Sequence, residues 1–480
     1  MRLYKGLTKQ EGDKLLSIYN SSFGIMRISE ILKKARETSG RIHLIGVLGA
    51  GQSAIAGLLL EKGYRLSGSD IKDIGEASEL LSLGLEYYPS HDEKNVKDAV
   101  LAVYTLAISD ENPEYVYSRT HGIPTVSRAE LAAALASGCE KLITVAGSHG
   151  KSTTTAMLAH MFSLAGKAPT VLSGAELALG RSYAVGGDEF FIAEACEYKD
   201  SFLKFRPSAA IINNVELDHT DYFSDLRAIE RSFSKYASRA SDFALLCADD
   251  PGAASLAVGE ETRALTFGCA SDSDYRYTLI ALGGVKSIFS VFSKHRGELG
   301  EFEINVPGVF NISNATAAIG AAVEYGLDLE QLREGVASFR GIGRRLEYIG
   351  EYRARSVFYD YAHHPTEIFH VIGALRAMGH DPITVVFKSH TYSRTAHLFS
   401  DFARSLSLAD YCVVGDIYAA REENVFGVTP EALAREIGES AFYSPDEYVT
   451  KTLDNLTRGT IVVMGAADMT EILKRMNLGK

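Results

Sequence analysis

The chain has 480 residues, of which 46% are hydrophobic and 23% are charged, with a formal net charge of −12. One hydrophobic core does not grow to this size, so an ordinary globular composition at this length predicts roughly three domains. The acidic charge is spread along the whole chain, which argues against a nucleic-acid or membrane-surface partner. A local glycine-rich or arginine-bearing pocket can still bind a phosphorylated anion in an acidic protein.

The segment Met1–Gly40 mixes charged and apolar side chains and lacks the continuous apolar stretch of a signal peptide. The longest apolar runs, such as Ile55–Leu60, are far shorter than the roughly 20 residues of a membrane span. The odd number and unpaired spacing of the cysteines predict reduced thiols and not a disulfide frame or a zinc site. These cysteines are Cys139, Cys196, Cys247, Cys269 and Cys412. We expect a cytoplasmic, multidomain protein.

Short β-rich apolar runs recur along the chain, and each is followed by a helix-like segment. The runs are Ile42–Val47, Lys141–Ala146, Ala209–Asn213, Thr384–Phe387 and Thr460–Met464. Strands that alternate with helices predict parallel α/β sheets. We predict a helical leader over residues 1–40 and three domains over residues 41–140, 141–340 and 341–480, with a β-rich insertion in the second between Thr262 and Val306.

The first predicted strand runs into a glycine pattern. Gly46, Gly49 and Gly51 are spaced G-x-x-G-x-G, and Asp70 ends the next strand roughly 20 residues later, where an acid can bind a ribose hydroxyl. The spacing differs from the G-x-G-x-x-G of dinucleotide sites. A nucleotide site, a nicotinamide site and a turn kept for packing all stay open from these residues alone.

A stronger pattern follows the strand Leu142–Ala146. It reads Gly147-Ser148-His149-Gly150-Lys151-Ser152-Thr153 and leads into an apolar-periodic helix. Backbone N–H groups in such a loop bind phosphate oxygens, the lysine reaches the β- and γ-phosphates, and the serine hydroxyl binds Mg²⁺. The alternative is a Gly/Ser turn with a solvated lysine. The strand and helix in register favour an ATP site.

Carboxylates and a histidine follow the next two strands. Glu194 ends the strand Phe190–Ala193, and Asp218 and His219 follow the strand Ala209–Asn213. The carboxyl ends of parallel strands open into the crevice where ligands bind. Glu194 is therefore a candidate to hold the nucleotide's Mg²⁺ together with Ser152, since Mg²⁺ prefers oxygen ligands. A structural and a functional role both stay open for His219.

Together these motifs resemble the Mur ligases, the cytoplasmic amide-forming enzymes of peptidoglycan precursor synthesis. The resemblance spans roughly residues 41–475 and includes motifs throughout the second half of the chain. These are Gly308–Ala315, Gly343–Glu347, Asp360–Glu367, Tyr392–Thr395 and Met464–Asp468. The His-His-Pro-Thr-Glu motif, Tyr-Ser-Arg-Thr, Ser67–Asp70 and Asn112–Glu114 resemble the branch that joins L-alanine to UDP-N-acetylmuramate.

The resemblance implies three α/β domains, the first and third Rossmann-like and the central one of the P-loop ATPase type. It assigns UDP-sugar binding to Gly46, Gly49, Gly51, Asp70 and His91, and ATP binding to Gly147–Thr153, Asn311, Arg345 and Asp360. It assigns the metal ions to Ser152, Glu194 and His219, the amino acid to Tyr361, His363 and Arg394, and catalysis to Lys151, His219, Arg345 and His363.

The resemblance also implies the chemistry. The lactyl carboxylate of UDP-N-acetylmuramate attacks the γ-phosphorus of ATP, two Mg²⁺ ions assist, and the amine of an amino acid then displaces phosphate from the acyl phosphate. The expected partners are small molecules only, with no nucleic acid and no membrane. The expected assembly is a monomer or a weak homodimer.

The chain departs from the branch in four places. Cys196 replaces Asp, Phe310 replaces His, and Arg421 replaces Gly. The segment Lys388–Tyr392 replaces Gln-Pro-His-Arg-Tyr, so Thr391 stands where an arginine would lie beside the amino acid. The amine is therefore open: a related ligase could join another amino acid or a peptide, as murein peptide ligases do, or act on another carboxylate. A nucleotide-sensing or dehydrogenase-like protein and a P-loop kinase are competing hypotheses of a different class.

Overall fold

The computed structural model describes residues 9–72, 75, 78–177, 180–220, 222–420, 422–456, 458–467 and 469–479, with side chains from residue 24 onward. Arg421, Asp468 and the first eight residues of the leader lie outside the described residues. The chain forms two compact units, Met1–Val145 with Gly166–Ala210 and Arg239–Phe243, and Ala146–Ala165 with Ile211–Ser238 and Ala244–Lys480. The predicted domain boundaries stay predictions.

The first unit contains a five-stranded parallel sheet in the order β3-β2-β1-β4-β5. The strands are β1 (Arg41–Ile45), β2 (Leu66–Ser69), β3 (Glu86–Tyr88), β4 (Ala99–Tyr104) and β5 (Thr125–Ser127). The strand order reverses between β1 and β4. In sheets of this kind ligands bind at that switch point, outside the carboxyl ends of the strands, and Gly46 follows β1 there.

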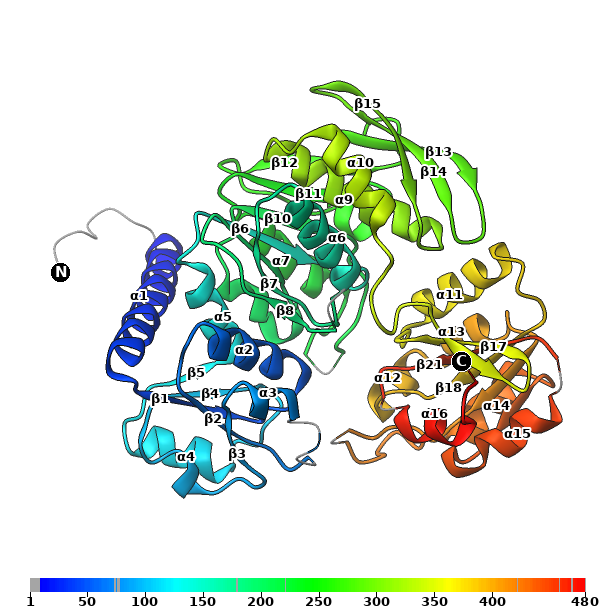
Figure 1. Ribbon diagram of the computed structural model, residues 1–480, viewed down its shortest axis with the longest axis horizontal. Helices are drawn as coiled ribbons and strands as arrows, with labels where there is room; N and C mark the ends of the chain where they lie inside the picture. Colours follow the sequence, from blue (N-terminus) through cyan, green and yellow to red (C-terminus); the bar gives the residue numbers. More distant parts are fainter. Residues whose placement is uncertain are drawn as a thin grey trace. The chain divides into compact units, whose positions relative to one another are not determined.

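Helices connect these strands, as the alternation in the sequence predicts (Figure 1). They are α2 (Ala50–Glu61), α3 (Ser78–Ser82), η2 (Glu93–Asn95), α4 (Pro113–Thr120) and α5 (Arg128–Ala136). Asn112 caps α4, and Ser127 with Glu130 forms a capping box on α5. These caps satisfy backbone donors that a helix start otherwise leaves unpaired.

The predicted leader helix is α1 (Lys9–Thr38), and it belongs to the first unit. Ile28, Leu32 and Ala35 are buried at helical spacing, and α1 packs against α5. The spacing places these three side chains on one face of the helix. The described part of the leader is thus a packed element of this unit.

The first unit also contains the strands that follow the first sheet in the chain. The strands β6 (Lys141–Ala146), β9 (Phe190–Glu194), β7 (Thr170–Leu172) and β8 (Tyr183–Ala184) are neighbours in that order, and only β8 is antiparallel. A 3₁₀ segment, η3 (Tyr198–Lys204), follows β9. The predicted strands at Lys141–Ala146 and Phe190–Ala193 are confirmed.

The second unit begins with α6 (Lys151–Leu164), the predicted helix after the glycine loop. Its further strands follow the order β15-β14-β13-β12-β11-β10. They are β10 (Ala209–Ile212), β11 (Phe243–Cys247), β12 (Arg263–Gly268), β13 (Tyr275–Leu282), β14 (Ser287–Ser293) and β15 (Gly297–Ile304). The pairs β13–β14 and β14–β15 are antiparallel, and alternate residues of β14 are buried. The β-rich insertion predicted between Thr262 and Val306 is confirmed.

Four helices accompany these strands, namely α7 (Leu226–Ala237), α8 (Pro251–Ala254), α9 (Val309–Glu324) and α10 (Leu329–Ser338). Helix α6 packs against both α9 and α10. Helix α9 is buried along most of its length, including Asn311 and Asn314. Two polar side chains inside an apolar helix require hydrogen-bond partners, and they face the site described below.

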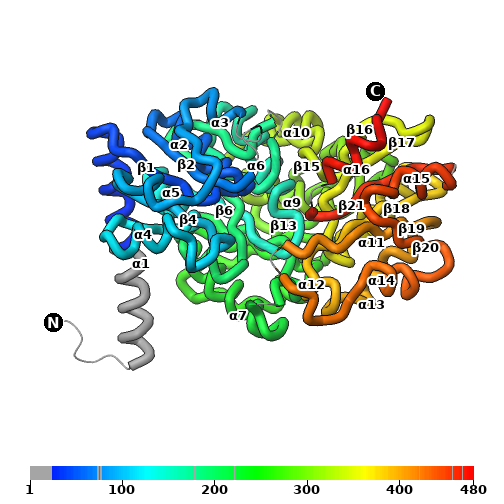
Figure 2. Tube along the Cα trace, turned by 90° about the horizontal axis from the view of Figure 1, so that it is seen from below, coloured from blue at the N-terminus to red at the C-terminus, as the bar shows by residue number. Residues whose placement is uncertain are grey.

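The rest of the second unit is a six-stranded sheet in the order β16-β17-β21-β18-β19-β20. The strands are β16 (Glu347–Tyr352), β17 (Arg355–Asp360), β18 (Ile383–Phe387), β19 (Tyr411–Val414), β20 (Ala441–Tyr443) and β21 (Thr460–Met464). Only β16 is antiparallel. Gly479 forms a bridge to Glu351, which holds the C-terminal end of the chain beside β16 (Figure 2).

Two buried clusters cover the two faces of this sheet. On one face Ile368, Phe402 and Leu433 pack on the strands, and on the other Leu453 and Ile472 do so. The helices that supply these faces are α11 (Pro365–Ala377), α12 (Tyr392–His397), α13 (Phe399–Leu406), α14 (Pro430–Ile437), η4 (Asp446–Tyr448), α15 (Val449–Asn455) and α16 (Thr470–Met476). Helices on both faces of a mostly parallel sheet confirm the predicted α/β class.

Among the residues that the structure describes, no helix combines the length and the apolar character that a membrane crossing requires. The five cysteines are free thiols.

Candidate functional site

The predicted phosphate loop lies at the start of α6, and two of its residues adopt backbone angles that favour glycine. Gly147 has φ 137° and Gly150 has φ 78°. A Cβ on Gly150 would lie 2.6 Å from Asn314 Oδ1 and 2.8 Å from Asn213 Nδ2. Both the backbone angle and the close side chains therefore require glycine there. The first N–H groups of the 14-residue helix α6 lie outside the helix's own hydrogen-bond ladder, as an anion site needs.

Residues after β10 hold this loop in shape. The His149 N–H donates to Asn214 Oδ1 at 2.7 Å, and the Glu216 N–H donates to Ser148 Oγ at 2.9 Å. The Lys151 ammonium donates to the carbonyls of Gly147 and Ser148. The loop is therefore preorganised by a segment that lies several strands further along the chain, and neither Asn214 nor Glu216 was among the predicted site residues.

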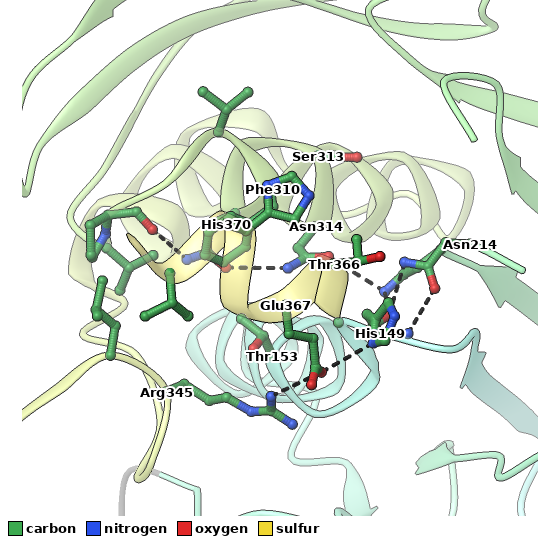
Figure 3. Close-up of a pocket in the computed structure, with 18 of the residues that line it drawn as sticks. His149, Thr153, Asn214, Phe310, Ser313, Asn314, Arg345, Thr366, Glu367 and His370 are labelled. Atoms are coloured by element: carbon green, nitrogen blue, oxygen red, sulfur yellow. Dashed lines mark hydrogen bonds and ion pairs between the residues drawn. The ribbon is translucent and has the colours of Figure 1, made fainter. Parts of the chain in front are cut away.

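His149 lies between two carboxylates, those of Glu216 and Glu367, and Figure 3 labels the second. Its Nδ1 is 3.1 Å from Glu367 Oε1, and its Nε2 is 3.4 Å from Glu216 Oε2. Burial disfavours the charged imidazolium, but Glu367 and Glu216 outweigh it and raise the pKa of His149 to about 9. The pKa of each carboxyl is correspondingly lowered, against the effect of burial. In this arrangement the predicted ATP-binding histidine carries a positive charge beside the phosphate loop.

Glu367 also gathers residues that were predicted for catalysis. Its carboxylate accepts the His363 N–H at 2.9 Å, lies 3.2 Å from His363 Nδ1 and lies 3.6 Å from Arg345 Nη1. Figure 3 shows Arg345 and His149 reaching Glu367 from opposite sides. The predicted amino-acid residue Tyr361 has its ring 5.4 Å from the Arg345 guanidinium carbon. Thus Arg345, Tyr361 and His363 do meet, around a carboxylate that the sequence analysis included in a motif but did not predict as a site residue.

Asp360, predicted to contact ATP, ends β17 and is buried. Its carboxylate accepts the Leu346 N–H at 2.6 Å and the Ala362 N–H at 2.7 Å. Burial raises the pKa of Asp360 to about 6, although Arg345 opposes the shift. The aspartate orients the two backbone turns that present Arg345 and His363.

A cavity of about 380 Å³ opens beside this cluster, within the usual range for small-molecule sites. It joins the predicted ATP residues His149, Gly150, Thr153, Asn311, Arg345 and Asp360 with others that the sequence did not indicate. Among the latter is Tyr277. Phe310 and Asn314, from the motif Gly308–Ala315, also line the cavity (Figure 3). Asn311 donates to the Pro307 carbonyl at 2.7 Å and accepts from Asn314 at 3.2 Å. The cavity has the size and the mixed lining that a nucleotide requires.

Arg394, predicted to bind the amino acid's carboxylate, instead pairs with Asp218. Its Nη2 lies 2.8 Å from Asp218 Oδ1 and 3.1 Å from Oδ2, and its Nε lies 3.2 Å from Oδ1. Both side chains are close to nine-tenths buried. Burial would raise the pKa of Asp218, but Arg394 holds it well below the usual range. The neighbouring His219 has φ 52°, and the Asp218 carboxylate accepts its N–H.

Two of the three residues that differ from the branch in the segment 388–392, Lys388 and Thr391, have local structural roles. Lys388 forms an ion pair with Asp446 and is only 13% exposed, so it does not point into solvent. Thr391 caps α12, where its hydroxyl accepts the Arg394 N–H at 3.3 Å, and its N–H donates to the Tyr418 carbonyl. Thr391 therefore positions the backbone of Arg394.

Glu194, predicted to hold Mg²⁺, lies in the first unit at the end of β9. Its carboxylate accepts a hydrogen bond from Ser173 Oγ at 2.8 Å and another from the Gly174 N–H. These donors orient the carboxylate, and its charge and oxygen donors fit the preference of Mg²⁺. Ser152, the predicted hydroxyl ligand, is buried at the start of α6 in the other unit.

In the first unit, the predicted sugar-nucleotide residues surround the switch point. Gly46 has φ 76°, and a Cβ on Gly51 would collide with the guanidinium of Arg128. The Asp70 carboxylate accepts the Leu48 N–H at 2.9 Å and the Ile71 N–H at 2.8 Å. Asp70 thus shapes the glycine loop itself.

A buried polar network lies beside this loop and centres on Glu114, whose side chain is fully buried. Glu114 lies 2.9 Å from His91 Nδ1 and 3.4 Å from His43 Nε2, and it accepts from Asn95 at 2.7 Å. Burial opposes ionisation, but the histidines and Ser69 lower the pKa of Glu114 to about 2. The pKa of His91 is raised, chiefly by its hydrogen bond to Glu114. Glu114 therefore favours the charged form of the predicted ligand residue His91.

Replacing Glu114 with glutamine should remove a pH-dependent part of the stability. A carboxyl whose pKa falls from 4.5 to about 2 on folding stabilises the fold above pH 4.5, and this stabilisation is lost as the pH falls towards 2. The shift corresponds to about 3 kcal/mol. Denaturant unfolding of wild type and Glu114→Gln should show the largest difference between pH 4.5 and about 6.5. The difference should shrink at lower pH, as Glu114 is protonated, and at higher pH, as His91 loses its proton. A difference independent of pH down to 3 would contradict this role.

Comparison with known proteins finds matches to one protein family along most of the chain, from residue 41 to residue 467. Three family models match in succession: "Mur ligase family, catalytic domain" over residues 41–139, "Mur ligase middle domain" over 145–322 and "Mur ligase, glutamate ligase domain" over 344–467. These three matches agree with the predicted three-domain architecture.

Individual relatives match almost end to end. A protein of Aquifex aeolicus named UDP-N-acetylmuramate–L-alanine ligase is 37% identical over 454 residues, which cover 93% of this chain and 100% of the relative. One of the same name from Acetivibrio thermocellus is 36% identical over 90% of this chain and 94% of its own length. The crystal structure of UDP-N-acetylmuramate-alanine ligase MurC from Thermotoga maritima superposes with a TM-score of 0.77 at 26% identity, covering 91% of this chain and 98% of that one.

Proposed function

The chain belongs to the Mur ligase family, and from that premise we propose that it joins L-alanine to the lactyl carboxylate of UDP-N-acetylmuramate and forms ADP. The observation that carries this proposal is the match at 36–37% identity, over at least 90% of this chain, to relatives that bear the name of this activity. The phosphate loop and the cluster around Glu367 support it, since an acyl-phosphate ligase must bind ATP and neutralise charge beside it.

The first step brings together anionic groups. The lactyl carboxylate oxygen attacks the γ-phosphorus, the bond from phosphorus to the β–γ bridging oxygen breaks, and ADP leaves with an acyl phosphate formed. Lys151 and Arg345 are the cations of this chain that would offset the charge of the transferring group. Ser152, Glu194 and His219 are the residues that would hold Mg²⁺, which would supply Lewis-acid stabilisation of the transferring group.

The second step needs a neutral amine. Its nitrogen attacks the acyl carbon, a tetrahedral intermediate forms, and phosphate leaves as the amide bond closes. His363, whose Nδ1 lies 3.2 Å from Glu367, is our candidate to receive the proton that the amine loses. Water has to be excluded, because it would hydrolyse the acyl phosphate.

We assign the two other substrates to separate groups of residues. The UDP moiety would bind at Gly46, Gly49, Gly51, Asp70 and His91, where His91 is held by Glu114. The amino acid's carboxylate would bind Arg394, with Tyr361 and His363 nearby. Arg394 would have to exchange at least one of its contacts with Asp218 for the substrate, since that pair uses its guanidinium in the structure.

The two candidate functions differ in the amine that the enzyme would join to the carboxylate. Thr391 replaces an arginine beside the amino-acid site, so a relative that joins another amino acid or a preformed peptide is the second candidate. A murein peptide ligase from Psychrobacter arcticus superposes with a TM-score of 0.70 at 22% identity, which is a likeness of fold alone. We further propose two Mg²⁺ ions, a cytoplasmic location, small-molecule partners only, and a monomer or weak homodimer.

Amine-dependent ADP release tests the proposal. With ATP, Mg²⁺ and UDP-N-acetylmuramate, we expect L-alanine to give the highest kcat/KM among L-alanine, glycine, L-serine and the murein tripeptide. Each reaction should give an amide product detectable by mass spectrometry. Preference for the tripeptide would establish the second candidate. A stable phosphorylated product with no amide would indicate a kinase, and ATP binding without turnover would indicate a sensor.

A further inference from the structure

Three side chains from distant parts of the chain converge between the phosphate loop and α11. His149 belongs to the loop, Glu216 follows β10, and His364 caps the N-terminus of α11. Glu216 Oε2 lies 3.4 Å from His149 Nε2 and 3.4 Å from His364 Nδ1. One donor atom of each residue lies within 4.8 Å of the other two. His364 Nδ1 also accepts the Thr366 N–H at 3.4 Å, a long hydrogen bond that a cation bound at this nitrogen would replace.

These separations suit a small divalent cation better than direct hydrogen bonds. Ligands about 2.0–2.1 Å from a tetrahedral zinc ion lie about 3.3 Å from one another, which matches the two distances of 3.4 Å. By contrast, 3.4 Å is long for a charged hydrogen bond. Within the described part of the chain, the buried ring nitrogens of His149 form no hydrogen bond of standard geometry, although Nδ1 lies 3.1 Å from Glu367 Oε1, and the buried Nε2 of His364 has no hydrogen-bond partner.

The surrounding residues have the arrangement that supports metal-ligating histidines and carboxylates. The second ring nitrogen of His149 faces a carboxylate, since its Nδ1 is 3.1 Å from Glu367 Oε1. Glu367 is itself fixed by the His363 N–H, and Glu216 accepts from Thr366 Oγ1 at 2.8 Å. A carboxylate on the far nitrogen of a ligating histidine fixes the ring and makes its donor nitrogen more basic.

We propose that His149, Glu216 and His364 form a binding site for a divalent transition cation of the zinc class. The donor set separates it from the Mg²⁺ site, because Mg²⁺ prefers oxygen ligands whereas imidazole suits zinc and cobalt. The three proposed zinc ligands are different residues from the predicted Mg²⁺ ligands Ser152, Glu194 and His219. His149 and Glu216 line the cavity, so the fourth coordination position would face it. The cation would take the place of the proton on His149 Nε2 and would link the phosphate loop to the start of α11.

Metal uptake by the full-length, chelator-treated protein tests the proposal without reference to activity. In calorimetry with zinc chloride, the wild type should bind one more equivalent than Glu216→Gln and than His364→Asn. Asparagine is a good helix cap, so His364→Asn should keep α11 intact. With cobalt(II) alone, the wild type should show the visible absorption of tetrahedral coordination, and both variants should lose that component.

Two controls separate this site from others. His370→Asn changes another histidine that lines the same cavity but is outside the ligand set, and it should bind zinc as the wild type does. His219→Ala removes a predicted ligand of the Mg²⁺ site and should keep the tetrahedral cobalt(II) absorption. Zinc uptake equal to wild type in Glu216→Gln and His364→Asn, or loss of the tetrahedral cobalt component in His219→Ala, would overturn the proposal. Circular dichroism of each variant verifies that the fold is kept, and His149→Asn gives a second ligand variant if one fails to fold.

Discussion

Lys151→Ala is expected to lower kcat for L-alanine-dependent ADP release by about 100- to 1,000-fold, the usual loss when one donor to a charged transition state is removed. In the structure the Lys151 ammonium lies over the loop and donates to the carbonyls of Gly147 and Ser148. Bound phosphate oxygens would offer it stronger acceptors at the same position. The methyl group of alanine leaves the start of α6 intact, because the loop's own contacts run through Asn214 and Glu216.

Lys167→Ala is the matched control for this experiment. Lys167 forms an exposed ion pair with Glu189 at 2.8 Å, and such pairs contribute little to stability. Its replacement should leave kcat within about twofold of the wild type, because the lost pair is worth only about 0–1 kcal/mol. Steady-state ADP release at saturating substrates gives both values. A decrease of less than about tenfold in Lys151→Ala, well short of a lost transition-state donor, would refute the assigned role of the lysine.

Arg394→Ala should produce the largest loss of stability among single changes in this site. The substitution leaves the buried Asp218 carboxylate without its bidentate partner, and breaking a buried pair in this way costs about 3–5 kcal/mol. Denaturant unfolding of the second unit should show the loss as a lower midpoint. The same variant should raise the KM for the amino acid if Arg394 also binds the substrate carboxylate.

A double-mutant cycle with Asp218→Asn separates these two roles. Removing the charge of Asp218 takes away the reason for the instability, so Asp218→Asn with Arg394→Ala should be more stable than Arg394→Ala alone. The amino-acid KM should stay raised in the double variant, because the substrate's partner is still absent. Additive losses of stability would mean that the pair is not coupled. A normal KM in both Arg394 variants would remove Arg394 from the amino-acid site.

Features that depend on residues close together in the chain were predictable. The phosphate loop, the strands that precede it and follow it, and the alternating pattern of the insertion are all encoded in short, continuous segments. Their structures follow from local glycine angles, burial and capping. The strand at Thr460–Met464, for example, has the predicted bounds.

The electrostatic core of the site was not predictable, because it depends on contacts across long stretches of chain. Glu216 and Glu367 reach His149 from two segments that are far apart in the sequence, and nothing in either segment marks the carboxylate as a partner of the loop. The resemblance to known ligases indicated Arg394 as a substrate residue, but not that Asp218 pairs with it. Thr391 was noted only as a departure from the branch, and the sequence did not indicate that it caps α12 with a φ of 67°.

The way the chain passes between the two units has a consequence for its biosynthesis. The first unit is built from residues up to 145 and then again from 166–210 and 239–243. A ribosome that has finished the five-stranded sheet must therefore add about a hundred more residues, over roughly 5–20 s, before that unit has all its strands. During this interval α6 and the phosphate loop emerge before most of their own unit exists. Nascent chains should accordingly become protease-resistant in the first unit only after residue 243 has left the exit tunnel, and gene fragments cut near residue 145 should express as aggregation-prone products.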